Sequence, residues 1–354
     1  MRHIDFDHNP GGFLMKRIQI ILLTTAVVLL SFAVVTAQTV KSGTSAAQFL
    51  KIGVGSRAVG MGEAFVATAN DVSAMYWNPA GLANLKSNEA IFFHSDWLAG
   101  INYDFAAFSV PLGAWGSFGG FFSGLTVPDD KVRTVHDPEG TGELFGASDI
   151  ALGISYAKNV TDRFSFGLNG KFIKESIWNM SATSVAMDVG ILYRSQLKDL
   201  RIGMMMSNFG TEMQMSGRNA LLFVDIDPTI NGNNDQIRAH LDMEKWDIPL
   251  QFRVGLAFDP IKTSVMRLTV GADAVHPSDN NEYLNGGIEY AFKEMLFLRG
   301  GYRGLGIDQL EGGLTLGGGF QYDFGGTAKI RLNYAYVDYG RLDSVNRYSI
   351  SVAF

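Results

Sequence analysis

Four histidines after the N-terminal apolar run are the first residues to consider for chemistry. They are His94, His136, His240 and His276, and imidazole nitrogens bind metals and carry protons near neutral pH. None has a spacing typical of metal ligands, and each falls at the end of an expected strand or in an expected loop. We therefore interpret them as solvated loop or interface residues and predict no metal site.

Two further groups could support catalysis or ion binding. Ser95 adjoins His94, but neighbours on a strand point to opposite faces, so they cannot form the pair that a hydrolase needs. The acidic residues from Asp225 to Asp235 offer oxygen ligands for calcium, yet their spacing does not match a calcium-binding loop. We interpret them as a polar loop and predict no enzymatic activity.

Composition excludes several classes of protein. The 354 residues contain no cysteine, which excludes disulfides, thiol catalysis, cysteine-ligated metals and a lipoprotein anchor. A hydrophobic share of 47% with 18% charged residues argues against disorder. The net charge of −6 gives no reason to expect nucleic acid as a partner. We predict no cofactor.

The N-terminus has the features of a secretion signal. Lys16 and Arg17 precede the apolar run 18–35, and small residues then lead to Ala37. This order of basic, apolar and small residues is typical of a signal peptide. We predict that residues 1–37 are a signal peptide cleaved after Ala37.

Two alternatives stay open at the N-terminus. Met15 stands just before the basic pair, so it is an alternative start. The run 18–35 approaches the length that crosses a bilayer, so a membrane anchor is the alternative to a cleaved signal. The small residues before polar Gln38 favour cleavage.

The last strand of the chain has one apolar face. Tyr348, Ile350, Val352 and Phe354 alternate with more polar or smaller residues. An apolar strand at the end of a soluble domain would be an exposed edge, whereas an outer-membrane barrel pairs it with the first strand and turns it toward lipid. We predict that these four residues form the strand used for membrane insertion.

Alternating segments fill the chain from Glu89 onward. The pattern predicts about fourteen antiparallel strands, at 89–95, 101–111, 114–125, 147–158, 163–175, 182–194, 199–209, 248–258, 266–276, 282–292, 295–303, 312–323, 328–338 and 346–354. The fold class is therefore all-β, and we predict that residues 89–354 form a transmembrane outer-membrane β-barrel.

A soluble β-sandwich is the alternative to a barrel, and loop lengths favour the barrel. The two longest connections, 126–146 and 210–247, both follow odd-numbered strands, so both fall on the outer side if the N-terminus is periplasmic. The short turns, such as Leu112-Gly113 and Lys293-Glu294, fall on the periplasmic side.

Charged residues are expected on the inward face of the barrel. In the predicted register these are Asp188, Arg194, Arg201, Arg253, Arg267, Asp273, Glu289, Arg299, Asp323, Lys329, Arg331 and Arg347. Because both signs are present, we expect them to pair and to fill the wall, which disfavours a wide apolar path.

Residues 38–88 precede the first strand and are glycine-rich. Asp71 is positioned to cap a helical turn, and Asn78-Pro79 is a favourable start for another. The segment is too short for an independent domain. We predict that it folds into the lumen as a plug or lies across the periplasmic mouth.

Two blocks in this segment carry a family resemblance. They are FLKIGVGSRAVGMGEAF at 49–65 and NDVSAMYWNPAGL at 70–82, and together they resemble the N-terminal signature of the PorV/PorQ family. Asn-Pro-Ala-Gly alone is similar to the wider FadL-like class of fourteen-stranded fatty-acid transporters. The motif residues with a structural role in the plug are then Gly60, Gly62, Asn78, Pro79, Ala80 and Gly81.

The resemblance implies a function in the outer membrane. A PorV-like barrel acts in type IX secretion, where it binds secreted cargo by C-terminal sorting domains and passes it to an attachment complex with a sortase-like partner. The alternative is a FadL-like transporter of hydrophobic small molecules. Outer-membrane lipid surrounds the barrel in both hypotheses. The charged lumen and the family resemblance favour the first one.

Met213 and Met215 stand at the start of the longest outer loop. Flexible, polarizable side chains suit a surface that accepts varied partners. We predict that these two methionines belong to a partner-binding loop.

Overall fold

The structure is a computed structural model, and it describes residues 43–196, 199–227, 229, 236–307 and 310–354. These residues belong to the unit Lys41–Phe354. The predicted signal peptide and its cleavage site lie outside the described residues. No helix within the described ranges is long and apolar enough to cross a membrane.

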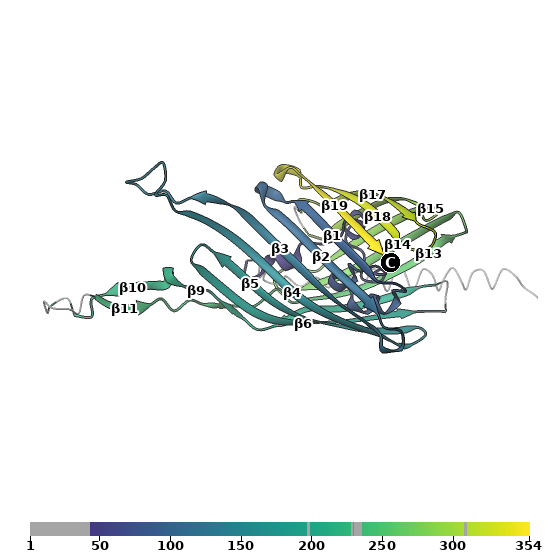
Figure 1. Cartoon of the computed structure of the whole chain (residues 1–354), viewed down its shortest axis with the longest axis horizontal. Coiled ribbons are helices and arrows are strands. Elements are labelled where there is room, and N and C mark those ends of the chain that lie inside the picture. Colours follow the sequence, from purple (N-terminus) through teal and green to yellow (C-terminus); the bar gives the residue numbers. More distant parts are fainter. Residues whose placement is uncertain (1–42, 197–198, 228, 230–235, 308–309) are drawn as a thin grey trace, which may run out of the picture. The chain divides into compact units, whose positions relative to one another are not determined.

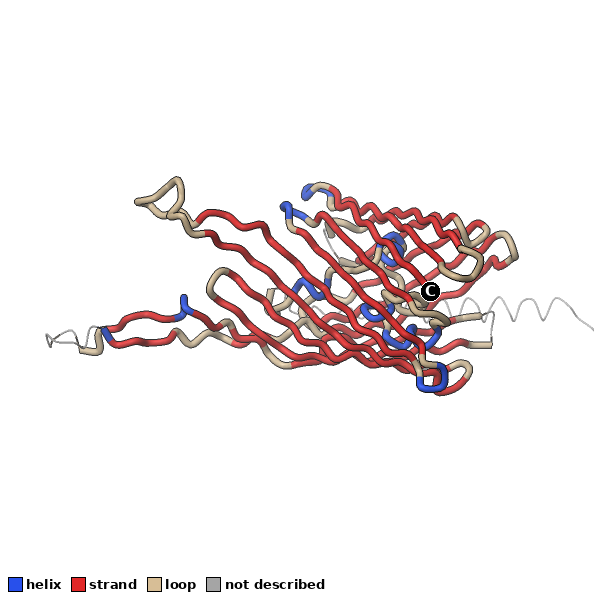
Figure 2. The backbone as a smooth tube through the Cα atoms, in the orientation of Figure 1, coloured by secondary structure: helices blue, strands red, loops and turns tan. Residues whose placement is uncertain are grey.

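Fourteen long strands of the described chain form one closed antiparallel β-barrel (Figures 1 and 2). They are β1 (Glu89–Asp96), β2 (Asn102–Pro111), β3 (Ser117–Lys131), β4 (Leu144–Thr161), β5 (Phe164–Ile177), β6 (Met180–Arg194), β7 (Arg201–Gly210), β13 (Gln251–Lys262), β14 (Met266–Pro277), β15 (Tyr283–Phe292), β16 (Leu296–Leu305), β17 (Leu314–Asp323), β18 (Lys329–Asp338) and β19 (Ser344–Ala353). Each strand pairs with its neighbours along the chain, and β19 closes the ring on β1. The predicted fold class is confirmed.

The alternation of each strand separates an apolar outer face from a mostly polar inner face. On β19, Arg347 and Ser349 are buried whereas Tyr348 and Ile350 are about half exposed. On β5, Asn169 and Lys171 are buried and Phe172 is exposed. This arrangement is the inverse of a soluble sandwich and is the pattern of a lipid-facing barrel.

The long connections share one end of the barrel, which we call the long-loop end, and the other is the short-turn end. Strands β3 and β4 continue further into their loop than predicted, past an irregularity between Val127 and Asp130. Bulges of this kind let a pair of strands continue with a stronger local twist. The β7–β13 connection carries the short strands β8 (Met213–Gln214), β9 (Ser216–Gly217), β10 (Leu221–Val224), β11 (Ile237–His240) and β12 (Lys245–Trp246).

Short helices occupy the segment before β1 and several turns. They are η1 (Gln48–Lys51), α2 (Ser56–Gly60), α3 (Ala74–Trp77) and η2 (Pro79–Asn84) before β1, then η3 (Leu98–Gly100), η4 (Gly113–Trp115), η5 (Arg218–Ala220) and η7 (Gly340–Leu342). Residues 114–115, predicted to begin the third strand, belong to η4 instead. We call residues 43–88 the luminal segment, because it contacts inward-facing residues of strands all around the ring.

Close backbone contacts hold the luminal segment against the wall. Gly62 has a φ of +64°, and a Cβ there would collide with the backbone of Gly286 and Tyr302. A Cβ on Gly301 would in turn collide with Gly62. Glycine is needed on both sides of this contact because two backbones meet without room for side chains. Other inward-facing glycines meet the segment in the same way, at Gly167, Gly190, Gly203, Gly271, Gly287 and Gly317.

Candidate functional site: a filled lumen with three voids

The motif residues of the luminal segment are all buried. Asn78 accepts a hydrogen bond from the Ala80 amide and begins η2 with Pro79 in its first turn, as expected for this pair. Its amide group also donates to the carbonyl oxygens of Val66 and Ile191, at 2.9 Å each. Asn78 therefore joins two parts of the luminal segment to β6.

Ionic anchors fix the segment near the short-turn end. The Arg57 guanidinium donates to both carboxylate oxygens of Glu289, at 2.8 and 3.0 Å. Arg299 and Arg267 also donate to Glu289, at 2.7 and 3.1 Å, and Glu289 is fully buried. Asp273 accepts hydrogen bonds from the backbone amides of the segment at Phe65 and Val66. Buried carboxylates with several charge-assisted partners are strong attachment points.

The expected pairing of inward charges holds for many of the twelve residues but not for all. Asp188, Arg253, Asp273, Glu289, Arg299 and Arg347 are buried. Asp323 pairs with Lys329 at 3.6 Å, whereas Arg194 is exposed near the short-turn end. Arg347 donates to the Gly53 carbonyl and to the Tyr339 hydroxyl, and its guanidinium lies 5.0 Å from the Trp97 ring centre. Neutral partners therefore take the place of a carboxylate at this residue.

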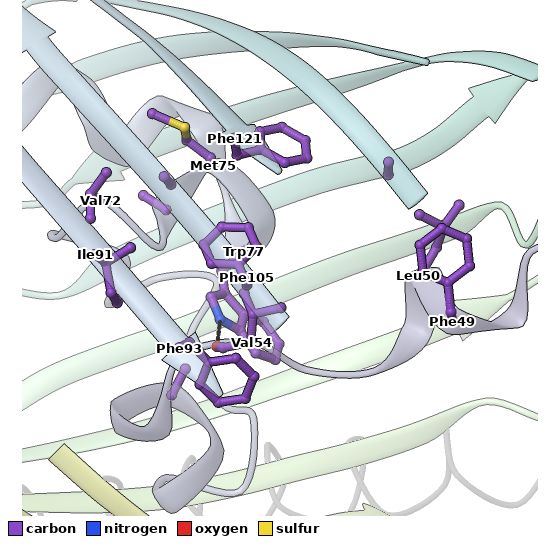
Figure 3. Packing of buried hydrophobic residues seen from close by; sticks show 14 of the residues in the cluster. Phe49, Leu50, Val54, Val72, Met75, Trp77, Ile91, Phe93, Phe105 and Phe121 are labelled. Atoms are coloured by element: carbon purple, nitrogen blue, oxygen red, sulfur yellow. Dashed lines mark hydrogen bonds between the residues drawn. The ribbon is translucent and has the colours of Figure 1, made fainter. Parts of the chain in front are cut away.

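One side of the lumen is apolar, which the sequence analysis missed. The inward faces of β1, β2 and β3 carry Phe93, Phe105 and Phe121. These rings pack with Trp77 of α3 in one buried cluster (Figure 3). The Trp77 indole donates to the Val54 carbonyl at 2.9 Å, so its one polar atom is satisfied. An apolar surface lines the lumen opposite the charged anchors.

A cavity of about 200 Å³ lies inside the long-loop end. The luminal segment contributes Ile52 to its lining, and the wall and loops contribute Trp97, Tyr283, Leu310 and Tyr339. We call it the outer cavity. An apolar protein cavity of about 150 Å³ accommodates benzene, so this volume suits a molecule of one aromatic ring.

The roof of the outer cavity is held by one carboxylate. Asp279, in the β14–β15 loop, accepts hydrogen bonds from Ser45 (2.6 Å), Gln48 (2.7 Å) and Lys51 (2.9 Å). Burial opposes ionisation, but these hydrogen bonds and the Lys51 ammonium lower the pKa of Asp279 below its ordinary value. Lys51 and the adjacent Asn280 line the cavity. We call this contact the Asp279 clasp.

A second void of about 20 Å³ lies deeper in the lumen. Gln251 lines both this inner void and the outer cavity, so its side chain separates them. Arg253 lines the inner void and donates to the Gln251 side-chain oxygen at 2.7 Å. The void is large enough for about one water molecule.

A third void is a hollow of about 960 Å³ on the outer face of β1–β6. Small residues such as Ala106 and Gly120 line it beside Phe108 and Phe122. Phe121 and Lys171 line both this wall hollow and the inner void. The outer cavity, inner void and wall hollow thus follow one another, with Gln251 at the first junction and Phe121 and Lys171 at the second.

Other predicted residues lie away from these voids. Met213 is almost fully buried and pairs with Trp246, and Met215 packs against the buried cluster. Their role in partner binding stays a prediction, but Met213 offers little surface for it. Tyr348 and Ile350 line a separate hollow of about 460 Å³ on the outer face, and Phe354 is exposed.

The histidines show no metal centre. His94 contacts Asp104 and Asp96 on the outer face, at 2.8 and 3.3 Å, and His276 contacts Glu282 at 2.9 Å. Ser95 is buried on the opposite face from His94, as the strand alternation predicts. No group of three potential metal ligands occurs within the described ranges.

Comparison with known proteins places the fold. The model of an uncharacterised protein family, UPF0164, matches residues 24–171. A UPF0164 protein of Treponema pallidum (strain Nichols) is 27% identical over 177 residues, which cover 46% of this chain and 44% of that protein. The match therefore spans less than half of the relative's length.

Solved structures match most of the chain at low identity. The toluene transporter TbuX of Ralstonia pickettii has a TM-score of 0.52 at 12% identity, with 85% of this chain and 97% of that chain covered. The toluene transporter TodX of Pseudomonas putida has a TM-score of 0.51 at 13% identity, with 83% and 96% covered. The CymD monoaromatic hydrocarbon channel has a TM-score of 0.52 at 13% identity, with 86% and 98% covered. The chain therefore has the fold of the FadL-like barrels, and the predicted PorV/PorQ relationship stays a prediction.

Proposed function

We propose that this protein is an outer-membrane β-barrel, without enzymatic activity, that admits small hydrophobic molecules about the size of one aromatic ring. The observation that carries the proposal is a series of three voids, two inside an otherwise filled lumen and one on the outer face of the wall. Two barrels of the same fold are described as toluene transporters, which supports the same class of substrate.

The route begins at the long-loop end. A molecule enters the outer cavity, where side chains such as Ile52 and Trp97 replace water around it, beside the ion pair of Glu63 with Arg303. It then passes Gln251 and the inner void, and leaves past Phe121 into the wall hollow. An exit through the wall suits an apolar molecule, because the hollow opens on the face that contacts lipid and the molecule never returns to water.

The apolar inner face of β1–β3 favours uptake of small hydrophobic molecules over cargo binding in type IX secretion, which the sequence alone favoured. The charged lumen was expected to leave no apolar path. The charges around Glu289 lie away from the route, which passes Phe121, whose ring packs against Phe105, and the ion pair of Lys171 with Asp188. The apolar face of β1–β3 and the Glu289 anchor thus occupy different sides of the same lumen.

Uptake of radiolabelled toluene tests the proposal. Cells with the protein in their outer membrane should take up toluene several-fold faster than cells without it. Ile52→Trp, which fills the outer cavity, should return the rate to that of cells without the barrel. Phe209→Trp is the matched control, since Phe209 is exposed on the outer face and should leave uptake unchanged. Equal uptake with and without the protein would contradict the proposal.

Cargo binding in type IX secretion is the second candidate, and one observation favours it. The two-stranded ribbon β10–β11 exposes Phe223 (63%) and Leu221 (44%). Isolated two-stranded ribbons with exposed apolar residues are marginally stable in water and are stabilised by a partner. Affinity purification through a tag in the 137–140 loop tests this candidate. Recovery of secreted proteins with a shared C-terminal domain, or of a sortase-like protein, would support it, and recovery of the barrel alone would count against it.

A further inference from the structure

We infer that Gln251 and Arg253 form the gate of the proposed route and exclude cations from it. This inference rests on the proposed function and identifies the residues that open the route and select the molecules that pass.

The partition consists of one side chain and its support. Gln251 is 2% exposed and is the residue common to the linings of the outer cavity and the inner void. Arg253 donates to its side-chain oxygen at 2.7 Å. The Arg253 guanidinium lies 5.1 Å from the Trp77 ring centre and 6.0 Å from that of Tyr76. A molecule about the size of one ring therefore passes only when this pair moves.

The gate is held more weakly than the other buried charges of the lumen. Six other buried or half-buried arginines in the described ranges form ion pairs with carboxylates, at Arg57, Arg201, Arg267, Arg299, Arg303 and Arg331. Arg253 forms no ion pair within the described ranges. The carboxylates of Asp273 and Glu63 attract it only from a longer distance. Its Nε–H is buried without a hydrogen-bond partner. Neutral partners cost less to exchange than a buried carboxylate, so Arg253 is the arginine best suited to move.

Unlike Arg253, Arg347 is restrained where it stands. It also lacks a carboxylate partner, but it donates to the Gly53 carbonyl at 2.8 Å and lies against Trp97. Neither cavity lining includes it. Its charge therefore contributes to the field in the lumen, while its hydrogen bond from β19 to the luminal segment makes it part of the scaffold.

The charge of the gate sets a preference among molecules of equal size. A cation that enters the inner void meets Arg253 and Lys171, of which Lys171 is paired with Asp188 at 2.7 Å. Arg253 is thus left as a positive charge in a site where water is scarce, and electrostatic repulsion is strong there. Neutral molecules do not meet this repulsion. The route should accordingly admit neutral molecules and reject cations of similar size.

Thiol labelling tests the gate directly, because the natural chain has no cysteine. Ser207→Cys places a nearly isosteric reporter in the lining of the inner void, and Asn280→Cys places a reference in the outer cavity. The probes are methyl methanethiosulfonate, which is neutral, and a trimethylammonium methanethiosulfonate, which is cationic. The reagents are added to intact cells.

We expect the reference cysteine to react quickly in every background and the Ser207→Cys reporter slowly. Gln251→Ala should accelerate the neutral reagent at the reporter at least tenfold. Arg253→Met should accelerate the cationic reagent more than the neutral one. Gln321→Ala is the matched control, because Gln321 also accepts a hydrogen bond from an arginine, Arg331, at 2.7 Å, but lines neither void.

Two outcomes would overturn the inference. One is an unchanged reporter rate in Gln251→Ala, with Gln251→Asn as the second variant if the first does not fold. The other is an equal acceleration by Gln321→Ala. Labelling reports access and does not require toluene transport. If Gln251→Ala accelerates labelling of the reporter but the cells take up no toluene, the proposed function alone is rejected. If the cells take up toluene but Gln251→Ala leaves the labelling rate unchanged, only this inference is rejected.

Discussion

Glu289 provides the sharpest test of how the lumen is held together. Its side chain is fully buried and accepts hydrogen bonds from Arg57, Arg267 and Arg299. In Glu289→Gln the first two arginines keep other carboxylates, since Arg57 also pairs with Asp71 and Arg267 with Glu294. Arg299, whose side chain is 1% exposed, keeps only neutral partners.

The expected loss of stability follows from the position of Arg299, which alone loses its carboxylate partner. Removing one partner of a buried ion pair costs about 3–5 kcal/mol, because the remaining charge stays buried without compensation. We therefore expect Glu289→Gln to lower the free energy of unfolding by that amount. Glu294→Gln is the matched control: Glu294 also pairs with Arg267, at 2.7 Å, but its side chain is 55% exposed. Exposed pairs contribute less than about 1 kcal/mol.

Denaturant unfolding of the purified barrel in detergent micelles, followed by circular dichroism, gives both values. The linear extrapolation assumes one cooperative transition, so coincident fluorescence and circular dichroism curves are required. Equal losses in the two variants would refute the claim that the Glu289 cluster anchors the luminal segment. Loss of the segment alone would show as protease sensitivity of residues 43–88 in a folded barrel.

Three further predictions follow from the same contacts. Because the pKa of Asp279 is lowered in the folded protein, its stabilising effect is present above the unfolded value of about 3.9 and is lost as the pH falls through the lowered value. Hydrogen exchange at residues 45–51 should thus rise only in strong acid, and Asp279→Asn should show the raised exchange already at pH 7. A rise of exchange in the natural protein near pH 6 would contradict this. Gly301→Val should displace the luminal segment, because its Cβ meets the Gly62 backbone, and should lower the melting temperature well below that of Gly318→Val, whose Cβ has ordinary contacts; similar melting temperatures would contradict the tight backbone contact. Phe121→Ala should speed toluene uptake by opening the second junction, and an unchanged rate would place the exit elsewhere.

Strand alternation made the barrel predictable, because the polarity of each residue separately matches the face of the wall that it occupies. Ser349 and Ile350 differ in the face that they occupy, and their polarity alone indicates which side contacts lipid. The positions of all fourteen strands follow from this pattern together with the turns. The ends were less predictable. Strands β3 and β4 remain paired beyond a bulge between Val127 and Asp130, and Pro128 within it is the residue that marks the irregularity.

The candidate site was less accessible to sequence reasoning, because it depends on contacts between distant residues. The apolar inner face was the main omission. Ile91, Phe92 and Phe93 are consecutive apolar residues in β1, and a strand that is apolar on both faces packs against protein on one and lipid on the other. That signal was present in the sequence. The junction at Gln251 was not, since nothing in its neighbours along the chain marks it as a shared lining residue.

Direct observation of a bound ligand tests the central claim best. Crystals of the protein soaked with iodobenzene, and measured for anomalous scattering by iodine, report where a ring-sized apolar molecule binds. The proposed route predicts an iodine peak in the outer cavity between Trp97 and Tyr283, which Ile52→Trp removes. Iodine peaks confined to the lipid-facing surface, with an empty outer cavity at saturating iodobenzene, would contradict it.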